Sequence, residues 1–236
     1  MNKIYNQADL VTTPSIAMKR VLKQENLKSP VKFISNGINC KSFTPKKEYK
    51  NLKKLIHVGR VSYEKNIEVI ILAMKKVLEH HPDASLHIYG TGPADNYLKE
   101  IVAHENLDKN IFFHGFVPHE KLPQIYQEHD LFVTASTIET QGLVILEAMA
   151  CGLPVIGVDK LAIPDLVINN EDGYLVEPFA PDKMARVISH MLNHGERFSE
   201  YGKRSIEIAK GHDFYNVMDE LENLYKKLAS EKESQH

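Results

Sequence analysis

The chain has 236 residues, 43% of them hydrophobic, and a formal charge of -2 at pH 7. This length holds one large α/β domain, or a domain with a fragment of another, and the apolar fraction is sufficient for a buried core. Because charges of both signs are interspersed, the sequence has no broad basic region, and we expect no nucleic-acid partner.

The amino-terminal part contains two short predicted strands. One covers residues 8–14 and precedes a helix that Ser15 can cap. The second runs into a turn at Asn36-Gly37. A polar, lysine-rich segment, residues 46–54, comes next, and this change of composition marks a candidate domain boundary.

From Leu55 onward, short apolar runs alternate with helical patterns, which predicts a Rossmann-like α/β fold. Such alternation implies a parallel sheet with helices on both faces and right-handed crossovers, and ligands of such sheets bind at the carboxyl ends of the strands. The expected strands are 55–59, 85–90, 111–115, 131–133, 155–158 and 174–176. After the last of them the chain is expected to be helical, ending in a disordered tail over residues 230–236.

Two glutamates with seven residues between them, Glu139 and Glu147, lie between the fourth and fifth predicted strands. A helix is expected to start near Gly142, which places Glu139 in the preceding loop and Glu147 about a turn and a half inside the helix. The free amides of Gln141, Gly142 and Leu143 at the helix start suit a phosphate. The pattern fits a nucleotide sugar, with ribose at Glu147 and hexose at Glu139; the alternative is two solvated surface glutamates.

Gly59 and Arg60 end the first strand of the alternating region, and Lys65 follows at the start of a helix. A glycine lets backbone approach a ligand, while the two cations can neutralise a diphosphate whose charge grows as a sugar leaves. We therefore consider them candidate stabilisers of a leaving group. The alternative is an ordinary surface arginine and lysine.

Two further strand exits carry weaker signals. Gly90 and Gly92 are consistent with a dinucleotide fingerprint, but Asp95 stands where the third glycine belongs, so a tight turn is the favoured interpretation. In the run HGFVP, backbone near Val117 can bond to a base edge, although an ordinary turn explains this run equally well.

The remaining chemistry-bearing residues predict no metal site. The twelve histidines show no paired ligand spacing, and no Asp-x-Asp occurs. The two cysteines, Cys40 and Cys151, lack metal spacing and are expected to be reduced thiols of a cytoplasmic protein. No apolar run approaches the roughly 20 residues of a membrane span, and the start lacks a signal-peptide core.

Together these motifs resemble the carboxyl-terminal, donor-binding half of GT-B glycosyltransferases of family GT4. The resemblance covers most of the chain and implies retaining transfer of a hexose from a nucleoside-diphosphate sugar, such as UDP-glucose, with no metal or other cofactor. It implies that Arg60 and Lys65 hold the diphosphate, that Glu147 holds the ribose and that Glu139 holds the sugar.

By the same resemblance, the Gly142 and Leu143 amides contact phosphate and hexose, and the Val117 region meets the base. Residues 1–45 look like a remnant of the amino-terminal acceptor domain, 46–212 like the donor-binding domain, and 213–236 like the helix that returns to the first domain, with its tail. Most of the acceptor domain is thus expected to be missing, and the isolated chain to bind donor but transfer poorly.

The chain departs from the common GT4 pattern after the second glutamate, where a glycine-rich turn and Pro-Glu are replaced by residues 159–163 and Pro164-Asp165. With the run Thr140-Gln141-Gly142-Leu143, the chain looks more like the branch that glucosylates diacylglycerol, which implies a membrane-lipid acceptor and peripheral membrane association of the whole enzyme. Other classes stay open. They are a nucleotide-sugar epimerase or dehydrogenase on a similar sheet, and a non-catalytic nucleotide-sugar-binding module.

Overall fold

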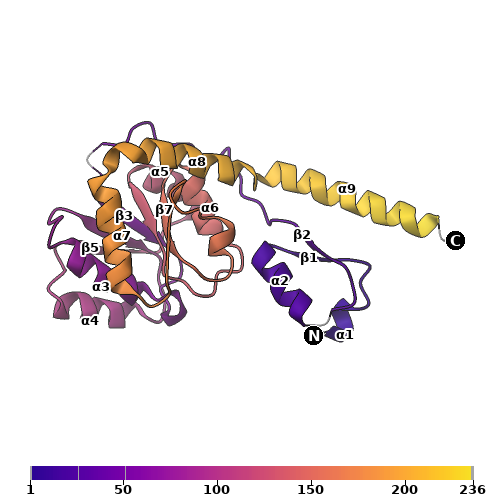
Figure 1. Ribbon diagram of the computed structural model, residues 1–236, viewed down its shortest axis with the longest axis horizontal. Helices are drawn as coiled ribbons and strands as arrows, with labels where there is room; N and C mark the ends of the chain where they lie inside the picture. Colours follow the sequence, from indigo (N-terminus) through magenta and orange to yellow (C-terminus); the bar gives the residue numbers. More distant parts are fainter. Residues whose placement is uncertain (1, 26, 51, 235–236) are drawn as a thin grey trace.

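The computed structural model describes residues 2–25, 27–50 and 52–234 and has a six-stranded sheet at its centre (Figure 1). The strands are all parallel and lie in the order β5-β4-β3-β6-β7-β8. They are β3 (Lys54–Val58), β4 (Ser85–Tyr89), β5 (Ile111–Gly115), β6 (Leu131–Val133), β7 (Val155–Val158) and β8 (Gly173–Val176). The chain order reverses between β3 and β6, so the carboxyl ends of these two strands are the expected ligand-binding position.

Helices cover both faces of the sheet, as the sequence predicts. On one face α3 (Ile67–Val77) packs against α4 (Asp95–His104) and α7 (Pro181–Asn193). On the other, α6 (Leu143–Ala150) packs against α8 (Phe198–Lys210), and α5 (Leu122–Gln127) joins α6 through a hydrogen bond from the Tyr126 hydroxyl to the Val144 carbonyl. Every residue of β6 and β7 is buried, which explains why these strands are continuous apolar runs. Short 3-10 turns are η1 (Tyr63–Lys65), η2 (His119–Lys121), η3 (Ile163–Asp165) and η4 (Gly195–Arg197).

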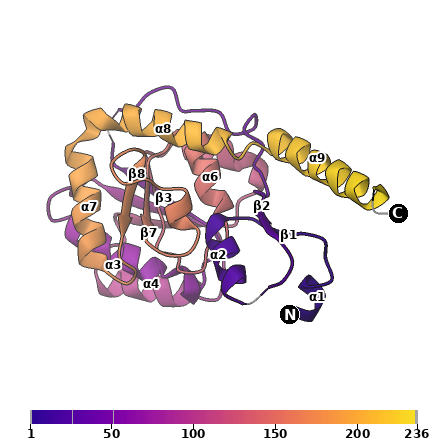
Figure 2. The same ribbon diagram turned by 45° about the vertical axis from the view of Figure 1, so that its right-hand side comes forward.

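The amino-terminal segment forms a small unit beside the core rather than extending its sheet (Figure 2). It comprises α1 (Asn2–Tyr5), β1 (Val11–Thr13), α2 (Ile16–Gln24) and β2 (Val31–Phe33), with β1 and β2 paired in parallel. Ser15 caps α2 as predicted, since its side chain accepts a hydrogen bond from the Met18 amide. The amide of Ala17 donates to Asp165 at 2.8 Å and so connects this unit to the main domain.

The lysine-rich segment before β3 is held against the domain by buried contacts. Lys46 Nζ lies 2.7 Å from Asp130 Oδ1, and both side chains are more than nine-tenths buried. The Tyr49 hydroxyl donates to the Gly152 carbonyl at 2.6 Å. The segment therefore contributes to the packing of the domain that follows it.

The last helix, α9 (Phe214–Glu233), projects away from the core (Figure 1). Residues 230–233 are helical, so the expectation of a disordered tail from residue 230 is wrong there; positions 235–236 lie outside the described residues. The polar sequence sustains the helix through pairs four residues apart, such as Lys226 with Glu222. Within the described residues, no helix has the length and apolarity needed to cross a membrane.

Candidate functional site

An acid and a cation meet where the sheet order reverses. Lys65 ends η1, which follows β3, and Glu139 lies in the loop that follows β6. Because β3 and β6 are neighbours, their exits adjoin, and Lys65 Nζ lies 2.5 Å from Glu139 Oε1. Both side chains are mostly buried, at 19% and 14% exposure. These two side chains are predicted from their sequence motifs to share one site, and the structure brings them into direct contact.

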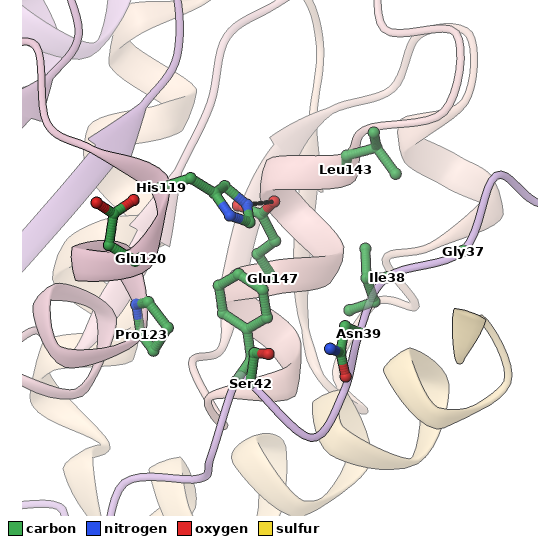
Figure 3. A pocket seen from close by; sticks show the side chains of 10 residues that line it. Gly37, Ile38, Asn39, Ser42, His119, Glu120, Pro123, Leu143 and Glu147 are labelled. Atoms are coloured by element: carbon green, nitrogen blue, oxygen red, sulfur yellow. Dashed lines mark hydrogen bonds and ion pairs between the residues drawn. The ribbon is translucent and has the colours of Figure 1, made fainter. Parts of the chain in front are cut away.

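The second glutamate is buried in the helix that follows the Glu139 loop. Gly142 adopts the left-handed conformation that starts α6, with φ at 81°, and Glu147 lies inside the helix with 7% of its surface exposed. Its carboxylate accepts a hydrogen bond from His119 Nε2 at 3.0 Å, which Figure 3 shows as a dashed line. A second bond comes from the buried Tyr126 hydroxyl at 3.2 Å. Burial raises the pKa of Glu147, and the bonds from His119 and Tyr126 oppose that rise.

Glu147 and Leu143 line a pocket of about 560 Å³. The amino-terminal segment, residues 37–43, forms its other wall, and Figure 3 shows Leu143 and Ile38 on one side of Glu147 with His119 on the other. The first amides of α6 have no helical acceptor and are available to an anion. This pocket therefore offers a carboxylate and a helix start to the same ligand.

A neighbouring pocket of about 230 Å³ holds Gly59, Arg60 and Val117. Arg60 is exposed, so its guanidinium is accessible to an anionic ligand. A Cβ on Gly90 would lie 1.8 Å from the Gly59 carbonyl oxygen, so this glycine is required for close approach of two backbones. The Asp95 amide donates to the Gly92 carbonyl at 3.2 Å, so the Gly90-x-Gly92 run leads into a tight turn before α4, as predicted.

The Gln141 side chain has a structural partner. Its amide nitrogen donates to Ser35 Oγ at 2.7 Å, and its oxygen accepts from the Asn36 backbone at 3.2 Å. With 3% exposure, this side chain fastens the Glu139 loop to the amino-terminal segment. Only its backbone amide therefore remains for the ligand-binding role predicted from the sequence.

The segment from Phe116 to Pro123 contributes lining residues to both pockets, and we call the two pockets together the crevice. Lys65 and Glu139 are not among the lining residues of either pocket. His119 and Tyr126, which hold Glu147, are the contacts that sequence reasoning missed. The run HGFVP indicates a role for the Val117 backbone, but no local pattern in the sequence indicates a role for His119. Within the described residues, no group of three His, Cys, Asp or Glu side chains is placed to hold a metal ion.

The family described as "Glycosyl transferases group 1" matches residues 41–208, which is more than half of the chain. The chain belongs to this glycosyltransferase family. The family and the GT-B fold expected from the sequence are thereby confirmed.

Among curated relatives of this glycosyltransferase is the alpha-monoglucosyldiacylglycerol synthase of Streptococcus pneumoniae, which is 30% identical over 72% of this chain and 42% of the relative. An uncharacterized glycosyltransferase of Methanocaldococcus jannaschii is 29% identical over 94% of this chain and 60% of the relative. The chain spans about half the length of the curated relatives it matches.

Solved structures agree with the fold. Sucrose-phosphate synthase from Thermosynechococcus elongatus superposes with a TM-score of 0.89 at 27% identity, covering 97% of this chain and 60% of that one. The pneumococcal O-GlcNAc transferase GtfA, in complex with UDP and GlcNAc, has a TM-score of 0.82 at 24% identity, covering 95% and 46%. At that identity the second similarity shows the fold alone.

Proposed function

We propose that this glycosyltransferase chain is the donor-binding part of an enzyme that transfers a hexose, with retention of configuration, from a nucleoside-diphosphate sugar. The observation that carries the proposal is the Lys65–Glu139 pair at the reversal of the sheet. Glu147, eight residues after Glu139, lines a pocket at the start of the next helix. An elongated ligand that reaches from the pair to this pocket would meet the cation, the sugar-binding acid and the ribose-binding acid.

Each part of the ligand has a complementary group in the crevice. The diphosphate suits Arg60 and Lys65, whose charges stabilise the leaving nucleotide. The ribose hydroxyls suit the Glu147 carboxylate, and the hexose hydroxyls suit Glu139. No cofactor is required for these contacts.

The helix start and the neighbouring turn complete the proposed donor contacts. The amides of Gln141, Gly142 and Leu143 are placed to contact phosphate and hexose oxygens. Backbone groups near Val117 are placed to receive the base, since Val117 shares a pocket with Gly59 and Arg60.

UDP-glucose is the proposed donor and diacylglycerol the proposed acceptor. Several structures with the same fold contain UDP, including that of Anabaena Alr3699/HepE with UDP-glucose. The pneumococcal relative is a glucosyldiacylglycerol synthase, which agrees with the sequence pattern around Pro164-Asp165. A lipid acceptor would bring the full enzyme, as a cytoplasmic protein, to the membrane surface.

The rest of the enzyme is proposed to supply the acceptor domain. Strands β1 and β2 form a sheet separate from the main one, and α9 leaves Phe214, Met218 and Tyr225 at least 36% exposed. These apolar side chains fit an interface with the missing domain. The catalytic cleft would then be open on one side, so the isolated chain should transfer sugar poorly.

Calorimetric titration of the chain with UDP, UDP-glucose, GDP-mannose and NAD tests the donor proposal. We expect UDP and UDP-glucose to bind and NAD not to bind. Binding of NAD without UDP would favour the dehydrogenase or epimerase alternative and overturn the proposal. A transfer assay with UDP-glucose and diacylglycerol vesicles tests the domain argument separately, because robust turnover by this chain would contradict it.

A further inference from the structure

A pocket of about 300 Å³ lies outside the donor crevice, where α3, α4 and α7 begin. Its walls include Tyr63, Glu68, Tyr97 and Phe179, and it shares no lining residue with the two pockets of the donor crevice. Tyr63 and Lys65 lie in the same short turn, but Lys65 is paired with Glu139 on the donor side. The pocket is therefore a separate candidate site.

The pocket gathers three exposed aromatic rings. Tyr63 is 61% exposed, Tyr97 38% and Phe179 66%. The Tyr63 and Tyr97 rings have centroids 5.7 Å apart and planes inclined at 46°, so they form a corner rather than a flat platform. A corner of ring faces suits a compact, rounded group better than a flat sugar ring.

Phe179 occupies an unfavourable backbone position. It lies between β8 and α7 with φ at 59°, in the left-handed region that bulky residues avoid. Its side chain is mostly exposed, so burial in the core does not compensate for this conformation. Strained residues of this kind concentrate at functional sites, and here the residue lines the aromatic pocket.

The pocket also has a defined charge. Glu68 is the one charged side chain among its lining residues in the described part of the chain, and the Tyr97 hydroxyl donates to its Oε2 at 2.7 Å. A carboxylate beside ring faces, with no cation among the described lining residues, disfavours anions and favours a positive ligand. The negative faces of the rings attract the same sign of charge.

We propose that this pocket is an aromatic cage for a quaternary ammonium group, of the size and charge of the head of choline. Its methyl groups would contact the ring faces of Tyr63, Tyr97 and Phe179, and Glu68 would neutralise its charge. Free choline and a choline-bearing lipid share this chemistry. The inference stands apart from the proposed transferase activity, because none of these side chains is assigned to the donor.

Calorimetric titration of the chain with choline, beside its uncharged isostere 3,3-dimethyl-1-butanol, tests the charge requirement. We expect choline to bind and the isostere to bind about tenfold more weakly or not at all. Glu68→Gln keeps the side chain's shape but removes its charge, and it should weaken choline binding about fivefold or more. Co-sedimentation with vesicles of phosphatidylcholine, compared with vesicles of phosphatidylglycerol, distinguishes the two sources of the ammonium group. Binding to the phosphatidylcholine vesicles would indicate the lipid, and binding of choline alone would indicate the free compound.

A second variant protects the test against loss of folding. Phe179→Gly removes one cage wall but places glycine where φ is positive, so the melting temperature should not fall while choline affinity does. Tyr225→Ala, at an exposed aromatic on α9, is the matched control and should leave choline binding unchanged. Equal binding of choline and its isostere, binding of methyl glucoside in place of choline, or full affinity in both cage variants would overturn the proposal.

Discussion

Lys65 and Glu139 are separated by 74 residues in the sequence, yet their side chains lie 2.5 Å apart across the exits of β3 and β6. The proposed donor needs both groups, one for its diphosphate and one for its hexose. Each group therefore has to exchange part of its bond to the other for a bond to the ligand.

This competition predicts a larger gain in affinity for UDP than for UDP-glucose when Glu139 is changed to Gln. Loss of the carboxylate releases Lys65 for the diphosphate, so UDP should bind about threefold to tenfold more tightly. UDP-glucose should gain less, because its hexose loses a charged acceptor. Calorimetry with both ligands measures the difference. Lys65→Met is the reference variant and should weaken the binding of both ligands. Weaker UDP binding in Glu139→Gln would contradict the competition.

His119 is predicted to act as a movable cover on Glu147. Its Nε2 donates to the carboxylate oxygen that a ribose hydroxyl needs, and its side chain is 68% exposed, with one edge contact to the Phe43 ring. His119→Ala should therefore raise UDP affinity by about twofold to fivefold, measured by calorimetry. Tyr126→Phe provides the contrast. Tyr126 is wholly buried and its hydroxyl orients the same carboxylate, so removal of the hydroxyl should weaken the binding of UDP. Weakening by His119→Ala would instead show that the histidine contacts the nucleotide.

The buried Lys46–Asp130 pair is predicted to be essential to stability. Asp130 Oδ1 lies 2.7 Å from Lys46 Nζ, and Oδ2 accepts from the amides of Lys53 and Lys54 at 2.9 and 3.0 Å. Asp130→Asn leaves a buried ammonium without its counter-charge and should lower the free energy of unfolding by about 3–5 kcal/mol. Asp83→Asn, in an exposed pair with Lys53, should cost less than about 1 kcal/mol. Equal losses in urea denaturation would refute this account.

Stability is predicted to fall in mild acid. Burial lowers the pKa of His57, His87 and His129 to about 4. An unfolded histidine titrates near 6.5, so between these values the unfolded chain binds more protons, and the free energy of unfolding decreases as pH falls. His57 is fully buried and should contribute about 3 kcal/mol of this loss between pH 6.5 and 4.

Urea denaturation across that pH range measures the effect. His57→Gln should flatten the dependence of stability on pH, whereas His104→Gln, at an exposed position, should not. Asp172 works in the opposite direction, because burial raises its pKa to about 6 and its protonation favours the folded state over the same range. An unchanged slope in His57→Gln would contradict the prediction.

The sheet and its helices could be predicted from the sequence because their signals are local. A strand buried on both faces is a continuous apolar run, as in Val155–Val158. Gly142 and Gly152 mark the start and the end of the helix that lies between these two glycines. Local signals place Lys65 after one predicted strand and Glu139 after another. Their contact follows because these two strands are neighbours at the reversal of the sheet.

What the sequence could not show depends on partners distant along the chain. Residues 46–54 have the composition of a linker, but Lys46 is buried because Asp130, 84 residues away, supplies its counter-charge. The bond of His119 to Glu147 spans 28 residues and links η2 to α6. Such side-chain geometry has no periodic signature, so only the folded arrangement reveals it.

Calorimetric titration of UDP into the Glu147→Ala variant is the most direct test of the claim that this crevice binds a nucleotide sugar through an acid on the ribose. The account predicts that the variant binds UDP about tenfold or more weakly than the unaltered chain. Glu120→Ala is the control, since this exposed glutamate lines the same pocket and should leave the affinity unchanged. UDP affinity unchanged in Glu147→Ala would contradict the account.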